Sequence, residues 1–236
     1  MQTAQNAPIA ESTGDFRHVE GWIFDLDNTL YPARADLFGQ IDRRMARYIG
    51  DFFGVSPDDA WRIQKTYYSE HGTTLNGLMH DHNIDPEHYL DFVHDIDLSV
   101  LAPDPSLARA IARLPGKRIV FTNGCARYAN RVLEQLSLSD HFDAVWDIRK
   151  IGFRPKPNPS SYRAVLSGHG LAAGRAAMFE DLARNLVPAH ALGMTTVWLK
   201  NGSEWSKQGP EHPIAEPGHI HYEIEDLASF LHSIRI

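Results

Sequence analysis

Short apolar runs alternate with amphipathic helical patterns along most of the chain. Four of these runs predict buried strands, namely Trp22–Phe24, Arg118–Phe121, Ala176–Phe179 and Thr195–Leu199. Ala144–Trp146 is a weaker fifth candidate. Helical spacing of apolar residues marks the segments between them: Ser106–Leu114, Ala126–Leu136, Ser160–Ser167 and Asn185–Leu192. Strands that alternate with helices of roughly ten to fifteen residues are typical of an α/β fold whose parallel sheet is covered on both faces.

The segment between the first predicted strand and Ser106 differs from the rest, because it contains no convincing strand. Helical spacing or a helix-starting sequence marks four stretches within it: Leu37–Phe53, the segment from Ser56, Thr74–Asp81 and Pro86–Val93. A helical insertion that leaves a sheet after its first strand is most simply a separate cap. We expect residues 34–104 to form this all-helical cap, and residues 18–33 and 105–236 to form the core.

The composition is that of a globular protein without an overall basic charge. The chain has 236 residues, of which 43% are hydrophobic, so it is long enough to bury a core without disulfides. Its 23 Lys and Arg residues against 30 Asp and Glu residues give a formal net charge of −7. Sequence-independent binding to nucleic acid needs a basic face for the phosphates. We therefore expect no nucleic-acid polymer as a partner.

Three features of the sequence favour a cytoplasmic protein without a membrane partner. Cys125 is the single cysteine, which excludes an intramolecular disulfide and fits a reducing compartment. No stretch approaches the roughly 18 apolar residues of a membrane span. The N-terminal residues lack the basic leader and apolar centre of a secretory signal. We expect residues 1–17 to form a disordered tail and Gly202–Gly218 to form a surface loop.

Two carboxylates, Asp25 and Asp27, follow the first predicted strand directly. In an open α/β sheet, ligands bind at the carboxyl ends of the strands. One carboxylate of such a pair can attack an electrophile, while the other donates a proton to the leaving group and later takes one from water. Two acids at this spacing are, by themselves, equally typical of a turn.

Three further segments place polar groups near the predicted sheet edge. Thr122-Asn123-Gly124 follows the second strand and offers a hydroxyl and free backbone N–H groups, which suit phosphate oxygens. Lys156 lies in a stiff proline-rich segment, and a fixed ammonium suits the charge of a transferring phosphoryl group. Glu180 and Asp181 end another strand, with Asn185 one turn later. Oxygen ligands of this kind are those that Mg²⁺ prefers.

In this order, the segments resemble the motifs of the haloacid dehalogenase (HAD) superfamily of phosphohydrolases. Its four motifs are DxDxT, a Ser or Thr at a strand end, a lysine and an acidic pair at a strand end. They are matched here by Asp25-Leu26-Asp27-Asn28-Thr29, Thr122, Lys156 and Glu180-Asp181. The resemblance covers the chain from Gly21 to Ile236. It implies a Rossmann-like three-layer α/β/α core with a parallel sheet and an inserted all-helical cap domain.

The resemblance also implies a role for each motif residue. Asp25 would be the nucleophile that forms an aspartyl-phosphate, and Asp27 would be the general acid and base. Mg²⁺ would bind to Asp25, the backbone carbonyl of Asp27 and Asp181, with Glu180 acting through water. Thr122, Asn123 and Lys156 would hold the phosphate. Asn185 would support the acidic pair. Haloalkanoate dehalogenases of the superfamily lack the second aspartate, so its presence favours phosphoryl transfer over carbon–halogen displacement.

A closer similarity is to the pyrimidine 5′-nucleotidase branch of the superfamily. It runs through Asp25–Pro32 and through two stretches of the cap, Tyr67–Leu78 and Phe92–Asp97. It implies a small phosphomonoester as the partner, namely a nucleoside monophosphate such as UMP or CMP. Five side chains are candidates for stacking on the base or bonding to its edge: Tyr31, Tyr67, His71, Thr73 and Thr74. Packing within the cap is the competing interpretation of each.

Several alternatives remain open at this point. A capped phosphatase or phosphomutase for sugar phosphates or phosphoglycolate would use the same core motifs. A phospho-accepting receiver module also places Asp, Thr, Lys and Mg²⁺ at strand ends, but its acidic pair comes first in the sequence and it has no helical cap. A binding protein on the same fold without catalytic activity is the remaining class. The sequence predicts neither the oligomeric state nor a role for the Gly202–Gly218 loop.

Overall fold

A six-stranded parallel sheet forms the centre of the molecule. The computed structural model describes residues 14–200 and 218–236. Within them the strand order is β3-β2-β1-β4-β5-β6. The strand bounds are β1 Gly21–Phe24, β2 Lys117–Phe121, β3 Ala144–Trp146, β4 Ala176–Glu180, β5 Thr195–Leu199 and β6 Tyr222–Ile224. Every residue of β1 and β4 is buried, as expected for central strands covered on both faces.

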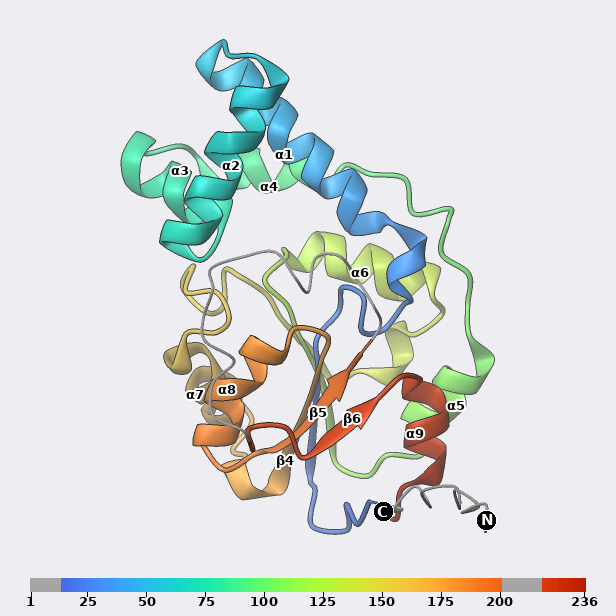
Figure 1. Ribbon diagram of the computed structural model, residues 1–236. Helices are drawn as coiled ribbons and strands as arrows, with labels where there is room; N and C mark the ends of the chain where they lie inside the picture. The colour runs from blue at the N-terminus through green and yellow to red at the C-terminus, as the bar shows by residue number, and fades with distance from the viewer. Residues whose placement is uncertain (1–13, 201–217) are drawn as a thin grey trace, which may run out of the picture.

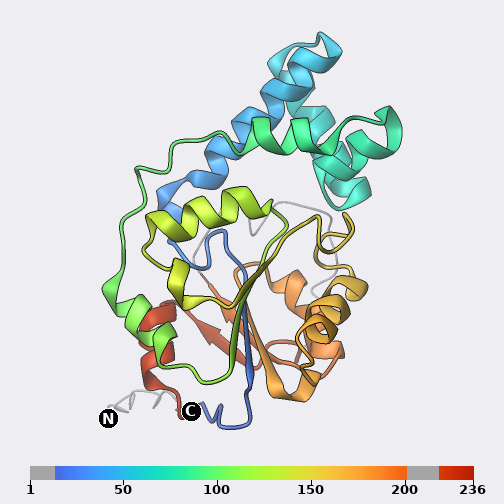
Figure 2. The same cartoon turned by 180° about the vertical axis from the view of Figure 1, so that it is seen from behind.

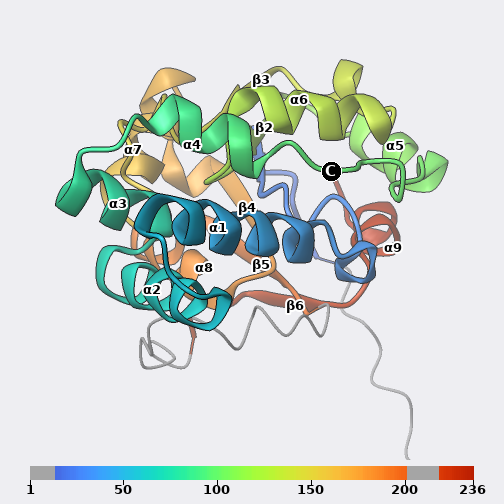
Figure 3. The same cartoon turned by 90° about the horizontal axis from the view of Figure 1, so that it is seen from above.

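Helices cover both faces of this sheet, which gives the three-layer α/β/α, Rossmann-like core that the sequence predicts. α7 and α8 lie on one face, and α5, α6 and α9 lie on the other (Figure 3). Their bounds are α5 Pro105–Ala112, α6 Ala126–Gln135, α7 Pro159–Gly168, α8 Ala183–Ala191 and α9 Leu227–Ser233. Short 3₁₀ turns complete the core and the entry to the insertion: Ala33–Ala35, Ser139–His141 and Ala173–Arg175.

Four helices inserted between β1 and α5 form a separate lobe above the carboxyl ends of the strands (Figures 1 and 2). They are α1 Leu37–Phe53, α2 Pro57–His71, α3 Thr74–His82 and α4 Pro86–Val93. α1 packs against α2 and α4, and α2 packs against α3. Side-chain caps set the starts of α2, α3 and α4: Ser56, Thr73 and Asp85 each accept a backbone N–H of the first turn.

Arginines of the core bind the last helix of this lobe. Arg127 of α6 pairs with Asp91 at 2.8 Å, and Arg149 forms a two-pronged ion pair with Glu87. Arg131 donates to the backbone carbonyl of His94 at 3.1 Å, where α4 ends. These three contacts hold α4 against the α6 side of the core.

The structure differs from the sequence prediction at both ends of the chain. The predicted tail 1–17 is too long, because Phe16 is fully buried and Asp15 pairs with Arg235 as an isolated bridge. Residues 1–13 and almost all of the predicted loop Gly202–Gly218 lie outside the described residues. β6 and α9 are absent from the prediction. No helix in the described ranges 14–200 and 218–236 has the length and apolar character needed to cross a membrane.

Candidate active site

The carboxyl ends of β1, β2 and β4 bring together the polar residues that follow these strands. Phe24 at the end of β1 pairs in register with Val120 of β2 and Phe179 of β4. The backbone N–H of Asp25 continues this pairing by donating to the carbonyl of Phe179 at 2.9 Å. Asp25 and the acidic end of β4 are therefore neighbours in space, although they lie far apart in the sequence.

Lys156 is the centre of the buried charge arrangement. Its Nζ lies 2.5 Å from Asp25 Oδ1, 2.8 Å from Glu180 Oε2 and 2.9 Å from the backbone carbonyl of Phe121. The residue is 3% exposed. Burial by itself would lower the pKa of Lys156, but the charges of Asp25 and Glu180 outweigh it and raise the pKa above its ordinary value. The ammonium is therefore charged at neutral pH.

The backbone around Lys156 is fixed by the side chain of Asn123. Asn123 Oδ1 accepts the backbone N–H of Lys156 at 2.8 Å, and Asn123 Nδ2 donates to the Lys156 carbonyl at 3.3 Å. This paired contact joins the loop after β2 to the proline-rich segment before α7. The contact thereby fixes the backbone from which the Lys156 ammonium reaches Asp25 and Glu180.

Asp25, Glu180 and Asp181 form a buried group of carboxylates. One oxygen from each lies within 4.8 Å of the others. Glu180 is held on both sides, because its Oε1 accepts from Asn185 Nδ2 at 2.7 Å and its Oε2 accepts from Lys156. Burial and the charge of Asp25 raise the pKa of Glu180 to about 7, and a cation beside these carboxyl groups would favour their ionised forms. An all-oxygen donor set of this kind fits Mg²⁺.

Asp27 lies beside this group and is held by two tyrosines. The hydroxyl of Tyr31 donates to Asp27 Oδ1 at 2.6 Å, and the hydroxyl of Tyr128 donates to the same oxygen at 2.7 Å. Burial and the charge of Asp25 raise the pKa of Asp27 to about 6, while the two hydroxyls oppose the rise. A carboxyl group with such a pKa can both give and take a proton near neutral pH.

Thr122 is fully buried at the end of β2. Its Oγ1 accepts the backbone N–H of Gly124 at 2.9 Å, which shapes the turn that follows the strand. Asn123 and Gly124 of this turn line the cavity above the carboxylates, and Thr122 does not. The predicted contact of the Thr122 hydroxyl with phosphate remains a prediction.

A cavity of about 170 Å³ extends from the carboxylates into the helical lobe. Core residues line its floor, and α1–α4 supply its upper wall. The lining from the core and the lobe includes Asp25, Asp27, Lys156, Asp181, Asp42, Gln64, Tyr68, Thr73, Thr74 and Tyr89. Gln64 Oε1 and Tyr89 Oη are buried and have no hydrogen-bond partner among the described residues. Apolar side chains of the lobe line the same cavity, so it has a charged floor and a mainly apolar upper wall: Phe38, Ile41, Met45, Leu75, Leu90 and Val93.

The candidate base-reading residues divide into two groups. Thr73 and Thr74 line the cavity, where Thr73 caps α3 and Thr74 Oγ1 donates to the carbonyl of Gln64 at 3.3 Å. Tyr31, Tyr67 and His71 do not line it. The contact of these three residues with a substrate stays a prediction.

Each of the three side chains has a different environment. Tyr31 is buried under Asp27, as its hydrogen bond requires. The ring of Tyr67 covers Gly77, where a Cβ would come within 2.4 Å of it, and its hydroxyl lies 2.7 Å from His82 Nε2. The ring of His71 is half-buried and lies beside that of His80.

Two residues that contact the carboxylates were not candidates in the sequence. Thr29 Oγ1 donates to Asp25 Oδ2 at 3.1 Å, so both oxygens of Asp25 are held. Its place as the last residue of the DxDxT motif is a signal that could have identified it. Tyr128 reaches Asp27 from α6, and no local sequence pattern marks a tyrosine in an amphipathic helix as different from a core residue.

The three-layer fold and this site define a class of hydrolases in which acidic residues and a lysine lie together at the strand ends. Residues 19–193 match the family of haloacid dehalogenase-like hydrolases, and the chain belongs to this family. It is also similar to Phosphate metabolism protein 8 of Saccharomyces cerevisiae, with 28% identity over 190 residues. That match covers 73% of this chain but only 59% of the yeast protein.

Two solved structures show that the fold is shared across the family. L-2-haloacid dehalogenase from Xanthobacter autotrophicus is similar with a TM-score of 0.55 and 16% identity, over 91% of this chain and 97% of that one. A HAD phosphatase from Thermococcus onnurineus is similar with a TM-score of 0.56 and 18% identity, over 92% and 100%. Relatives with both kinds of chemistry share the fold, so the residues at the strand ends must decide the reaction.

Proposed function

We propose that this hydrolase is a Mg²⁺-dependent phosphomonoesterase that acts through an aspartyl-phosphate. The observation that carries the proposal is the position of Asp27, a carboxyl group with a pKa of about 6, beside the Asp25 carboxylate. A phosphate ester needs a proton on its leaving oxygen, and a second carboxyl group can supply it. Asp27 therefore favours phosphoryl transfer over displacement of a halide, which needs no such proton.

The reaction follows from the residues that line the cavity floor. An oxygen of Asp25 attacks phosphorus, the bond from phosphorus to the ester oxygen breaks, and Asp27 gives its proton to that oxygen. Asp27 then takes a proton from water, which attacks the phosphorus of the aspartyl-phosphate and releases inorganic phosphate and free Asp25. Lys156 and Thr29 hold the two oxygens of Asp25, so the nucleophile is oriented before the substrate arrives.

The carboxylates at the ends of β1 and β4 are the proposed cation ligands. Asp25, Asp181 and the backbone carbonyl of Asp27 would hold Mg²⁺, and Glu180, which contacts Lys156 and Asn185, would act through water. When bound, Mg²⁺ supplies positive charge that offsets the repulsion between an anionic nucleophile and an anionic ester. Lys156 contributes to the same compensation from the protein side.

We further propose a nucleoside monophosphate, in particular a pyrimidine nucleotide, as the substrate. The lobe would act as the cap that receives the nucleoside. Support comes from the cavity wall, where the apolar side chains of Phe38, Ile41 and Leu90 offer a surface for a planar base. Thr73 and Thr74 add backbone and hydroxyl groups to the same wall. A planar leaving group with polar atoms at its edge fits a wall of this kind.

The experiment is phosphate release from a panel of esters, with Mg²⁺ and with EDTA. The panel contains UMP, CMP, dUMP, AMP, GMP, sugar phosphates and phosphoglycolate. Asp25→Asn removes the nucleophile, and Asp140→Asn, an exposed acid of the Ser139–His141 turn, is the matched control. We expect Mg²⁺-dependent release from pyrimidine nucleotides that only Asp25→Asn abolishes.

The alternative outcomes separate the chemistry from the substrate. Release from sugar phosphates or phosphoglycolate alone would keep the mechanism and reject the nucleotidase. Absence of turnover of every ester by correctly folded protein would reject the phosphatase. An unchanged rate in Asp25→Asn would reject the aspartyl-phosphate.

A further inference from the structure

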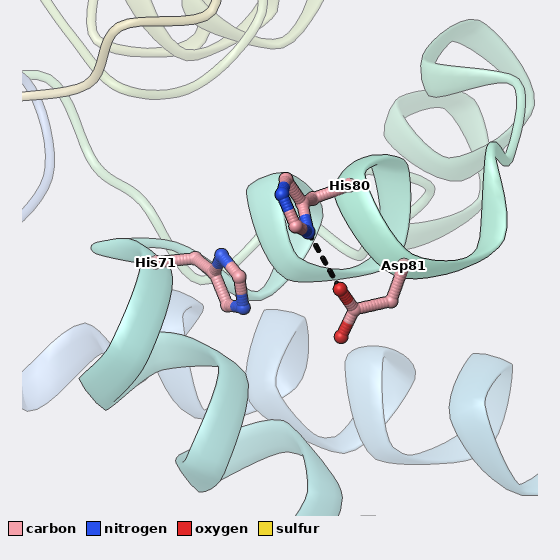
Figure 4. A group of neighbouring side chains, drawn as sticks. All are labelled: His71, His80 and Asp81. Carbon is pink, nitrogen blue, oxygen red and sulfur yellow. Dashed lines mark hydrogen bonds and ion pairs between the residues drawn. The ribbon is translucent and has the colours of Figure 1, made fainter.

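Two histidines and an aspartate form a second group of possible metal ligands, outside the cavity. His71 lies at the C-terminal end of α2, and His80 and Asp81 lie in α3 (Figure 4). One ligand atom of each lies within 4.8 Å of the others. Among residues 14–200 and 218–236, only this group and the carboxylates Asp25, Glu180 and Asp181 meet that condition.

The donor atoms of this group differ from those of the active site. His71 and His80 offer imidazole nitrogens, and Asp81 offers a carboxylate oxygen. Imidazole favours Zn²⁺, Cu²⁺ and Ni²⁺, whereas carboxylate and carbonyl oxygens favour Mg²⁺. His80 Nδ1 and Asp81 Oδ1 already lie within hydrogen-bond distance of one another. The two groups are therefore suited to different cations.

We propose that His71, His80 and Asp81 bind a transition-metal cation of the Zn²⁺ type on the helical lobe. Zn²⁺ binds nitrogen and oxygen ligands at about 2.0–2.2 Å, which requires ligand atoms roughly 3.3 Å apart in a tetrahedral site. His80 Nδ1 and Asp81 Oδ1 are 2.6 Å apart, so this pair opens slightly when the cation replaces the proton between them. Solvent would supply the fourth ligand.

The backbone already places the three side chains on one side of the α2–α3 corner. The turn is set by Gly72, with a φ of 78°, and by the Thr73 cap of α3. The rings of His71 and His80 are tilted by 40° and their centroids lie 5.2 Å apart. Figure 4 shows the two rings beside each other, from the end of α2 and from α3. His80 and Asp81 are exposed and His71 is half-buried, so their rotation toward a cation meets little resistance from packing.

The neighbouring histidine His82 belongs to a different contact. Its Nε2 lies 2.7 Å from the hydroxyl of Tyr67, and its ring packs against Phe53. His82 is therefore not part of the proposed site, although it follows Asp81 directly in the sequence. The run His80-Asp81-His82 alone would suggest that all three residues bind the same cation.

A cation at this site would join the end of α2 to α3 by a cross-link that their packing does not supply. The same corner carries Thr73 and Thr74, which line the cavity. A Cβ on Gly72 would lie 3.8 Å from Pro155, next to Lys156, so the corner is also close to the core. Zn²⁺ would therefore stabilise the part of the lobe that lies over the catalytic lysine segment.

The test is calorimetric titration of the full-length chain with Zn²⁺ in saturating Mg²⁺, repeated with Co²⁺ for its visible absorption. His71→Gln and His80→Gln each remove one nitrogen ligand. His88→Gln is the matched control, because His88 is an exposed histidine of the same lobe outside the group. Asp181→Asn tests for binding at the carboxylates instead.

We expect one equivalent of Zn²⁺ to bind, with affinity about tenfold or more weaker in His71→Gln and in His80→Gln. Affinity should be unchanged in His88→Gln and in Asp181→Asn. The Co²⁺ complex should show the intense visible bands of a four-coordinate site and lose them in His80→Gln. Equal binding by wild type and both ligand variants, loss of binding in Asp181→Asn, or no binding at all would overturn the proposal.

Discussion

The hydroxyl of Tyr128 donates to Asp27 Oδ1 at 2.7 Å, from a helix that begins about a hundred residues after that aspartate. Tyr128 is 1% exposed, and its ring is stacked on His94, with centroids 4.6 Å apart. The carboxyl group that we propose as the acid and base is thus oriented by a side chain fixed in the core. Its other oxygen remains free of these two tyrosines.

Tyr128→Phe should lower kcat while leaving KM for the phosphate ester nearly unchanged. The variant keeps the ring packing and removes one of the two hydroxyls that orient Asp27, so proton transfer becomes less well aligned. We expect a loss of about 10- to 100-fold in kcat. Steady-state kinetics measure it, with Tyr222→Phe as the control because Tyr222 lies on β6 and packs against Phe16. Equal kcat in both variants would argue against the positioning role.

Lys156→Met should destabilise the protein strongly as well as inactivate it. The substitution leaves Asp25 and Glu180 buried without their cation, and removal of one partner of a buried ion pair costs about 3–5 kcal/mol. Lys200→Met breaks the 2.7 Å pair with Glu223, whose side chains are half exposed, and should cost about 1 kcal/mol or less. Urea unfolding compares the two. Similar losses would show that the Lys156 contacts are not buried charge pairs.

Mg²⁺ should raise the free energy of unfolding through the carboxylate group, and EDTA should remove the effect. A ligand that binds only the folded state contributes about 2.7 kcal/mol at a hundred times its Kd. Asp181→Asn removes a proposed ligand and should abolish the gain, while Asp140→Asn should retain it. Thermal unfolding with and without Mg²⁺ measures both. A Mg²⁺ effect of full size in Asp181→Asn would place the cation elsewhere.

His94 should make the protein less stable as the pH falls. Burial, with nearby arginines, lowers the pKa of His94 from 6.5 to about 3 in the folded protein. Between about pH 3 and pH 6.5, His94 therefore binds a proton in the unfolded chain but not in the folded one. The free energy of unfolding should fall by up to about 1.4 kcal/mol per pH unit across this window.

Urea unfolding of wild type and His94→Phe at several pH values tests this. The variant should lose less stability on acidification, by a slope of about one proton. His88→Phe, at an exposed position of the same helix, should follow the wild type. Parallel curves for wild type and His94→Phe would mean that His94 takes up its proton equally in both states.

The parts of the fold that follow from periodic patterns could be predicted from the sequence. Within residues 14–200 and 218–236, five of the six strands lie where apolar runs indicate. The four helices of the insertion lie where apolar spacing or a helix-starting sequence indicates. β6 and α9 are too short for the sequence to predict. β6 has three residues, of which one is an exposed glutamate, and α9 has only seven. Phe16 was placed in a tail because its burial depends on Trp22, Tyr222 and Phe230, which are distant in sequence.

The candidate site shows the same limit. Residues at strand ends could be brought together from the sequence, because parallel strands end at one edge of the sheet. Tyr31 could not be assigned, since a tyrosine in a DxDxT-containing segment can turn toward a cavity or toward the preceding aspartate. Its hydrogen bond to Asp27 depends on a turn that reverses the chain, in which Asn28 has a φ of 59°.

The place of β1 in the sheet has a consequence for how the chain folds. β1 is central, yet its two partners begin only at Lys117 and Ala176. The inserted helices between them contact mainly their neighbours in sequence. Local contacts close quickly, whereas pairing across long separations first incurs the entropy of loop closure. The helices of the insertion should therefore become ordered first. The sheet, whose strands come before and after the insertion in the sequence, should be completed last.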